Sequence, residues 1–503
     1  MIAGPSSQFE NTYPLAVPEP AVARHPDTIT NPRELRRWLD RLPHTDPGQM
    51  VKQLARQLSL LVRDPRPDNK FGMLLKSYHE PINSLQQQAM TTRQRAAETR
   101  THAQISLLTS LPTLFRELAN GHMRAVKLSL DGGRTPDAAD IFAAELLMRR
   151  AIHWELLEYR MFRPTIWQQV AQLYNVAILH RLEGVSVECD LIHPGDPSNT
   201  HDLFFSTLAL LLADPYRLPS HCIRELEQRL PQYAAKLDLG PDGSSQSRLP
   251  LELSGQTSPL HYARQPDPSL PAQFLSLDRL LNELHPGKVD AAGCDLDAWL
   301  QESLGRLLGG NHERRQQRRA RNADYHFVVG VQAVHRRLRS LQPGQSDDDP
   351  RESDCAPAFC GTPCVQVDVS GSGSGFILPG NQRYPDPGDW ALFELDTPPG
   401  EARISGFAGQ IRRCMRDEDD YLRIGVERLT GNVIPVNLGS KRTPALLNAD
   451  QTQRLYRLIA PHGYFEEGKQ DTLYGSNKNY LVKHLEVLSR EGGTEIIRLA
   501  LLG

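Results

Sequence analysis

Residues 367–378 read VDVSGSGSGFIL. The apolar residues at both ends favour β-structure, while serine and glycine alternate from Ser370 to Gly375. Glycine weakens a strand, because it brings no side chain to pack and loses much conformational freedom on folding. A glycine-rich strand therefore indicates a bulge, a bend or the close approach of another group to the backbone.

The last third of the chain has the pattern of an antiparallel β-structure. After Asn322, short strand-like runs follow one another with turn residues between them. Residues 410–426 predict a hairpin across the acidic turn at 416–420, and residues 480–502 predict a second hairpin that turns at 491–493. Several short strands with regular turns predict a small barrel or sandwich.

The first 240 residues instead have the period of α-helices. A helix is predicted to begin at Asn31, where a capping Asn, a first-turn Pro and Glu34 follow one another. Further helical stretches are predicted at 46–61, 70–100, 103–119, 136–161, 165–181, 201–213 and 220–236. One stretch has the spacing of a tetratricopeptide first helix, at Trp167, Val170, Ala171, Tyr174 and Ala177. No second copy follows one period later, so core packing is the preferred explanation, in a helical bundle or a solenoid.

Composition shifts along the chain suggest its domain organisation. The expected fold class is α+β multidomain, with an N-terminal all-α bundle or solenoid followed by a β-barrel and an extra β-rich segment. The expected parts are a flexible tail at 1–29, a helical domain at 30–240, a linker with short helices (272–284 and 296–309) at 241–309, a barrel at 310–440 and a β-rich extension at 441–503.

The overall composition is that of an ordinary soluble protein. The 503 residues carry a net charge of −3, so no bulk electrostatic force draws the chain to nucleic acid or to an anionic membrane. The N-terminus lacks the pattern of a signal peptide, and the longest apolar run, at 203–213, is too short to span a bilayer. Seven cysteines fit a reducing cytoplasm better than a disulfide framework. We therefore expect a cytoplasmic protein without a membrane span.

A cluster of arginines precedes the first predicted strand. Residues 311–322 read NHERRQQRRARN, which places Arg314 four positions before Arg318 and Arg315 four positions before Arg319. A guanidinium donates two parallel hydrogen bonds to phosphate oxygens or to the O6/N7 edge of guanine, and its flat face stacks on a purine. Either pair could therefore hold both a phosphate and a base.

The glycine-rich stretch supplies complementary groups. Asp368, Ser370 and Gly373 form an Asp-x-Ser-x-x-Gly pattern. A carboxylate can accept from guanine N1–H and N2–H₂, and a serine hydroxyl can donate or accept. A charge run alone is usually a solvated face, and a Gly-Ser run alone is usually a loop. Together, in this order and beside a strand, they predict a nucleotide site.

These two motifs resemble those of the PilZ-domain family. An arginine pair before the first strand, an Asp-x-Ser-x-x-Gly motif and a later strand ending in IGVERL are typical of these six-stranded barrels. The resemblance implies a bacterial receptor for cyclic di-GMP. The arginine pair, Arg315 and Arg319 or Arg314 and Arg318, would grip guanines and phosphates, while Asp368 and Ser370 would contact a guanine. The segment between the motifs, which includes residues 339–364, is longer than the family usually has.

The chain as a whole resembles the PilZ subgroup in which a long helical domain precedes the barrel. This resemblance implies a signal passed by conformational change to a protein partner of the helical domain, in the control of surface attachment, pili or flagella. No cofactor is expected besides the ligand.

Three other classes of function are weaker alternatives. A scaffold with a degenerate barrel would keep the fold without the ligand. An RNA-binding module would need an exposed aromatic platform, for which the sequence gives no sign, so no nucleic-acid partner is expected. The sequence shows no catalytic triad order, no paired carboxylates with a plausible cleft, no Walker loop and no His-Glu-x-x-His motif, so we do not expect an enzyme.

The cysteines suggest one further alternative. Cys355, Cys360 and Cys364 are irregularly spaced, and a zinc site would need a fourth ligand such as Cys414 or a histidine. Free thiols are the expected state, and no metal is expected.

Overall fold

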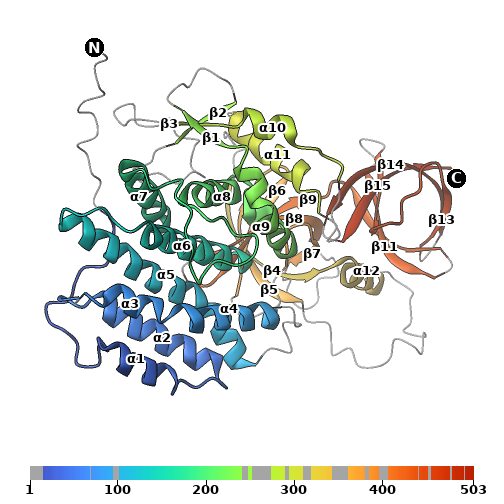
Figure 1. The fold of residues 1–503 in the computed structure, drawn as a ribbon. Helices are drawn as coiled ribbons and strands as arrows, with labels where there is room; N and C mark the ends of the chain where they lie inside the picture. The colour runs from blue at the N-terminus through green and yellow to red at the C-terminus, as the bar shows by residue number, and fades with distance from the viewer. Residues whose placement is uncertain are drawn as a thin grey trace, which may run out of the picture.

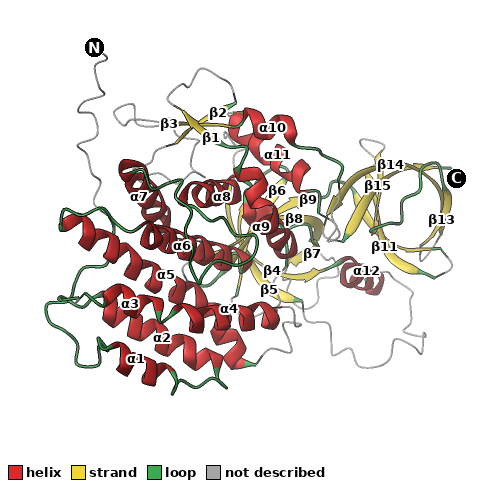
Figure 2. Cartoon of the chain, viewed as in Figure 1, coloured by secondary structure: helices red, strands yellow, loops and turns green. Residues whose placement is uncertain are grey.

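The structure, a computed structural model, describes residues 15–67, 69–93, 101–161, 163–240, 247–251, 273–288, 294–309, 319–341, 361–379, 385–395, 406–417, 419–439, 441–450, 455–475, 478–491 and 493–502. Helices and strands are segregated along the chain, as expected for an α+β protein (Figure 2). The helical part forms one side of the molecule, and two barrels follow one another on the other side (Figure 1).

The helical part begins where a capping asparagine was expected, since the Asn31 side chain accepts a hydrogen bond from the Arg33 amide. The helices are α1 (Pro32–Leu39), α2 (Pro47–Val62), α3 (Phe71–Lys76), α4 (His79–Arg93), α5 (His102–Asp131), α6 (Ala138–Leu157), α7 (Pro164–His180), α8 (Thr200–Leu212) and α9 (Ser220–Ala234). The expected end of a helix at residue 119 was wrong. Gly121 does not stop α5 but lets it pack closely, because a Cβ there would lie 2.5 Å from Leu75 Cδ2.

The segment expected to be a linker contains packed structure. A small sheet forms from β1 (Asp238–Gly240), β2 (Arg248–Leu251) and β3 (Gln273–Ser276), followed by α10 (Asp278–Glu283) and α11 (Leu296–Leu308). Helix α11 packs on the end of α8, where Ser303 Oγ donates to the Leu212 carbonyl at 2.7 Å and Trp299 Nε1 donates to the Ala213 carbonyl at 2.8 Å. This packing brings together two cysteines 72 residues apart, Cys222 and Cys294, which form a disulfide that the sequence did not predict.

The first barrel closes in the strand order β4-β5-β6-β9-β8-β7. Its strands are β4 (Arg319–Val329), β5 (Thr362–Val369), β6 (Gly373–Leu378), β7 (Trp390–Leu395), β8 (Gly406–Arg416) and β9 (Leu422–Arg428). The hairpin expected across residues 416–420 is the β8–β9 pair and is confirmed. The interior holds an aromatic cluster in which the Phe376 ring lies 4.3 Å from the Phe393 ring and 5.5 Å from the Tyr325 ring, between centroids.

A second barrel closes in the order β10-β11-β12-β15-β14-β13, strand for strand the same as the first. Its strands are β10 (Asn432–Leu438), β11 (Thr443–Asp450), β12 (Leu455–Pro461), β13 (Gln470–Tyr474), β14 (Asn479–Glu491) and β15 (Thr494–Leu501). The sequence predicted only a β-rich extension here, although the final hairpin, β14–β15, was expected and is confirmed. Because β10 pairs with β11, the second barrel begins before residue 440.

The helical part and the first barrel share one hydrophobic core, which runs from α1 to β9. At their junction, the Arg416 amide donates to the Tyr159 carbonyl at 2.6 Å, and the Tyr159 hydroxyl donates to Asp386 at 2.6 Å. Helix α12 (Val331–Ser340) packs between the two barrels, where Val334 and Trp390 meet Leu446. No helix among the described residues is both long and apolar enough to cross a membrane.

Candidate functional site

The Asp-x-Ser-x-x-Gly motif forms a hairpin turn. Asp368 is the penultimate residue of β5, Ser370 lies in the turn and Gly373 begins β6. The Ser370 amide donates to the Gly373 carbonyl at 2.8 Å, and the Gly373 amide donates to Ser370 Oγ at 3.2 Å. The expectation that the motif lies along one strand was wrong, because the serine hydroxyl satisfies a backbone group of the turn.

The glycines of this stretch are partly explained by the motif itself. A Cβ on Gly375 would lie 2.7 Å from Oδ1 of Asp368, and a Cβ on Gly373 would lie 3.0 Å from the Val426 carbonyl oxygen. The group that approaches the β6 backbone is therefore the Asp368 carboxylate. This contact fixes where the half-buried carboxylate lies on the outside of the barrel.

Of the four expected arginines, the structure describes only Arg319; Arg314, Arg315 and Arg318 lie outside the described residues. In the β4–β5 ladder, Arg319 is opposite Val369, and Ala320 is opposite Asp368. Side chains directly opposite one another share a face of a sheet, and successive residues alternate between faces. The register thus places Arg319 on the other face of the sheet from Asp368.

Strand β9 adds charged residues beside the motif that the sequence did not single out. Glu427 is directly opposite Gly373 and pairs with Arg412 at 2.7 Å. The Arg428 amide donates to the Ser372 carbonyl at 3.0 Å, and its guanidinium lies 3.9 Å from the Phe407 ring centroid. Burial lowers the pKa of that guanidinium. Glu427 and Arg428 lie in the IGVERL stretch, which the sequence analysis identified as a strand typical of PilZ barrels without assigning either residue a role.

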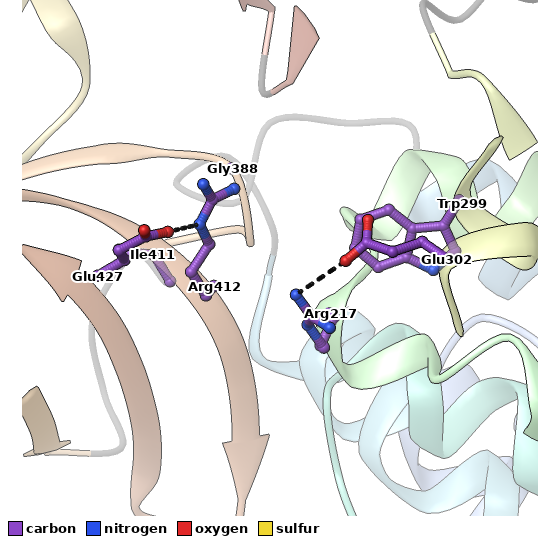
Figure 3. A pocket seen from close by; sticks show the side chains of 7 residues that line it. All are labelled: Arg217, Trp299, Glu302, Gly388, Ile411, Arg412 and Glu427. Carbon is purple, nitrogen blue, oxygen red and sulfur yellow. Dashed lines mark hydrogen bonds and ion pairs between the residues drawn. The ribbon is translucent and has the colours of Figure 1, made fainter. Parts of the chain in front are cut away.

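A cavity of about 230 Å³ adjoins this strand, between the first barrel and the helical part. It is lined by Arg217, Trp299, Glu302, Gly388, Ile411, Arg412 and Glu427 (Figure 3). Two ion pairs face one another across it: Arg412 with Glu427 on the barrel side, and Arg217 with Glu302, 3.8 Å apart, on the helical side. The Arg217 guanidinium also lies 5.6 Å from the Trp299 ring centroid. Both cations of the cavity are thus already paired.

The cysteines considered for a metal site are only partly described. Cys364 and Cys414 are buried free thiols of the first barrel, and burial raises the pKa of each, while Cys355 and Cys360 lie outside the described residues. Among the residues that the structure describes, His221, Cys222 and Cys294 place three possible metal-ligand atoms within 4.8 Å of one another. The two cysteines of that group are joined as a disulfide.

Residues 33–242 match the family model described as the N-terminal domain of the cyclic-di-GMP receptor FimW. The helical part is therefore similar to the N-terminal domain of that receptor family. The match covers most of α1–α9 and ends at the small sheet. A search of curated proteins finds no match for this chain. The resemblance to a receptor subgroup with a long helical domain is thereby confirmed, and the two closed barrels are consistent with PilZ-like domains.

Proposed function

We propose that this chain is a receptor for cyclic di-GMP that binds its ligand at the first barrel. The observation that carries the proposal is the match of residues 33–242 to the N-terminal domain of a cyclic-di-GMP receptor. The barrel that follows this FimW-type domain supplies a carboxylate on a hairpin turn that fits the guanine-binding motif of PilZ domains.

The chemistry of the site follows from its groups. The Asp368 carboxylate would accept hydrogen bonds from N1–H and N2–H₂ of a guanine, donors that adenine does not present in that arrangement. A guanidinium pair would neutralise the phosphates and stack on the bases. Because Arg319 faces away from Asp368, we favour Arg314 and Arg318 over Arg315 and Arg319 as this pair.

The output of such a receptor would be mechanical rather than catalytic. Ligand binding would shift the arrangement of the arginine segment and the barrel, and the helical part would present this change to a protein partner. We propose, on the family resemblance, that this occurs in the cytoplasm and controls surface attachment, pili or flagella.

Calorimetry of the full chain with cyclic di-GMP tests the function, with linear GpG and cyclic di-AMP as controls. We expect tight binding that is specific for the cyclic guanine ligand. A molar ratio of two would indicate an intercalated ligand dimer, and a ratio of one would keep the receptor without the dimer. No heat and no thermal shift would instead indicate a scaffold with a degenerate barrel.

A pair of double variants tests the choice of arginines. Arg314→Ala with Arg318→Ala should abolish detectable binding, whereas Arg315→Ala with Arg319→Ala should weaken it less. Equal binding by the first double variant and the wild type would show that the site is wrongly placed.

A further inference from the structure

A single row of cross-strand neighbours crosses the outside of the first barrel. Asp368 on β5 is opposite Gly375 on β6, Gly375 is opposite Gly425 on β9, and Gly425 is opposite Arg413 on β8. Two glycines therefore separate a carboxylate from a guanidinium along one line perpendicular to the strands.

The contacts show that these residues share the outer face. A Cβ on Gly375 would meet the Asp368 carboxylate, and a Cβ on Gly425 would lie 3.7 Å from Cβ of Arg413. Their neighbours along the strands, Phe376, Ile424 and Cys414, are buried in the barrel. Since side chains alternate along a strand, the row points outward.

Packing against the described residues does not require glycine at 425. Its φ is not in the left-handed region, and a Cβ there would make only the ordinary contact with Arg413. Gly409 on the adjacent strand differs, because a Cβ there would lie 2.6 Å from the Glu427 carbonyl oxygen. The glycine at 425 therefore leaves bare backbone where the fold would accept a side chain.

Arg413 differs from the arginines around it. Arg412, Arg416 and Arg423 form ion pairs with Glu427, Asp420 and Asp417. Arg413 is exposed, and among the described residues no carboxylate pairs with it.

The Arg413 guanidinium lies 5.7 Å from the ring centroid of Tyr216, in the short helix η2 (Pro215–Arg217) of the helical part. An exposed guanidinium without a carboxylate partner is suited to binding an anion or a purine edge.

We propose that one guanine of cyclic di-GMP lies flat on Gly425, between Asp368 and Arg413, and that Arg413 is a further ligand-binding residue. This inference rests on the proposed function and names a subsite of the same site. Three strand spacings, roughly 14 Å, separate the backbones of Asp368 and Arg413. The two side chains reach inward from the ends of this span and leave room for a purine between them. Asp368 binds the N1–H and N2–H₂ donors, and Arg413 donates to O6 and N7.

The position of Arg413 also connects the ligand to the helical part. A guanidinium that turns to a guanine changes its contact with the Tyr216 ring, which is buried and whose hydroxyl donates to the Arg160 carbonyl at 3.1 Å. Binding at the row is therefore communicated to η2 through Arg413.

Calorimetry of the full chain tests this subsite with Gly425→Val and Arg413→Ala. Valine covers the bare backbone, and we expect at least about a hundredfold weaker binding of cyclic di-GMP, because the base can no longer lie there. Loss of the Arg413 hydrogen bonds should weaken binding about tenfold. The matched control is Arg423→Ala, two residues along the outer face of β9, which should bind as the wild type does.

Thermal unfolding establishes that the variants are folded. Valine favours strands over glycine, so Gly425→Val should unfold at no lower temperature than the wild type. Gly425→Ala, with its smaller side chain, provides a milder variant that should also weaken binding if the surface is occupied by a base.

The outcomes separate the two proposals. If the wild type binds cyclic di-GMP and Asp368→Ala binds it more weakly, but Gly425→Val and Arg413→Ala bind as the wild type does, the subsite is overturned and the receptor stands. If the wild type itself does not bind, the receptor function fails. Weakened binding by Gly425→Val and Arg413→Ala, but not by Arg423→Ala, supports the subsite.

Discussion

The two barrels have the same strand order, but their outer surfaces are built differently. In the first barrel, the row from Asp368 to Arg413 passes over Gly375 and Gly425. In the second, a comparable row across β11, β12, β15 and β14 consists of Asn448, Arg457, Arg498 and Glu486. Asn448 is buried, the other three positions carry long side chains, and Arg498 pairs with Glu486 at 2.9 Å. One topology thus carries an open surface in one copy and a filled surface in the other, so the fold alone does not assign a site.

The barrels also differ in how they are attached. The interior of the first barrel is continuous with the core of the helical part, whereas the second barrel has a core of its own. The first barrel closes through five residue pairs between β4 and β7, from Tyr325↔Leu395 to Val329↔Ala391. Among the described residues, the second closes between β10 and β13 through the pairs Asn437↔Tyr474 and Leu438↔Leu473. Each difference can be tested by a matched pair of measurements.

The largest expected effect is on stability. Phe376→Ala empties the aromatic interior of the first barrel and should cost about 3–5 kcal/mol of unfolding free energy, while Ile497→Ala in the second should cost about 2–5 kcal/mol. Hydrogen exchange during urea unfolding should show that Phe376→Ala weakens the helices together with the first barrel. Ile497→Ala should weaken only the second barrel; exchange that changes in the helices as well would contradict the separate cores.

The next effect is on ligand affinity. Asp368→Ala should weaken binding of cyclic di-GMP by about a hundredfold, because it removes a charged acceptor for the guanine, and should relax the preference over cyclic di-AMP. Arg498→Ala, in the filled row of the second barrel, should leave the affinity unchanged in calorimetry. A loss with Arg498→Ala and none with Asp368→Ala would move the site to the second barrel.

A smaller effect concerns pH and the helix between the barrels. Burial, assisted by the nearby Arg339 and Arg336 cations, lowers the pKa of His335 to about 4 from an ordinary 6.5. Between these two pKa values the unfolded chain binds a proton at His335 and the folded chain does not. This histidine therefore lowers the free energy of unfolding as pH drops from about 6.5 to about 4. His335→Gln should reduce that fall, measured as urea midpoints at several pH values. An unchanged pH dependence in the variant would show that the pKa of His335 is the same in the folded and the unfolded chain.

The smallest effect concerns the seam of each barrel, the strand pair that closes it: β4–β7 in the first barrel and β10–β13 in the second. Amides at the short β10–β13 seam, such as Leu438, should exchange with solvent about tenfold faster than amides at the β4–β7 seam, such as Phe327, because fewer cross-strand pairs must open. A cavity of about 220 Å³, lined in part by Asn437 and Tyr474, adjoins the shorter seam. Native-state exchange read by mass spectrometry checks this order, and equal protection of the two seams would remove the difference.

The sequence predicted the order of the parts better than the details of the site. Helical periodicity and the Asn31 cap marked the helical part, and the turns at 416–420 and 491–493 marked two hairpins. The second barrel was missed because β11 and β12 alternate only weakly between buried and exposed residues, and closure of the barrel depends on contacts distant in sequence. The Cys222–Cys294 disulfide was missed for the same reason, since the packing of α11 brings its two ends together.

Within the site, residue types were predictable but their orientation was not. The motif identified Asp368 and Ser370, yet only the strand register shows that Arg319 faces away from Asp368. The roles of Gly425 and Arg413 depend on three successive registers, β5–β6, β6–β9 and β9–β8, and a single β-bulge in each flanking pair shifts the alignment. No local sequence pattern carries this information.

The shared core of the helical part and the first barrel limits the amplitude of any motion between them. Two bodies on a flexible tether can swing through large angles, but two bodies with one packed interior move as a stiff block, because close-packed interiors have low compressibility. The backbone hydrogen bond from Arg416 to Tyr159 strengthens this junction. A conformational signal that passes through this junction is therefore a displacement of the order of one side chain. A protein partner must then detect a change in the local shape of the helical part, because the distance between the helical part and the first barrel hardly changes.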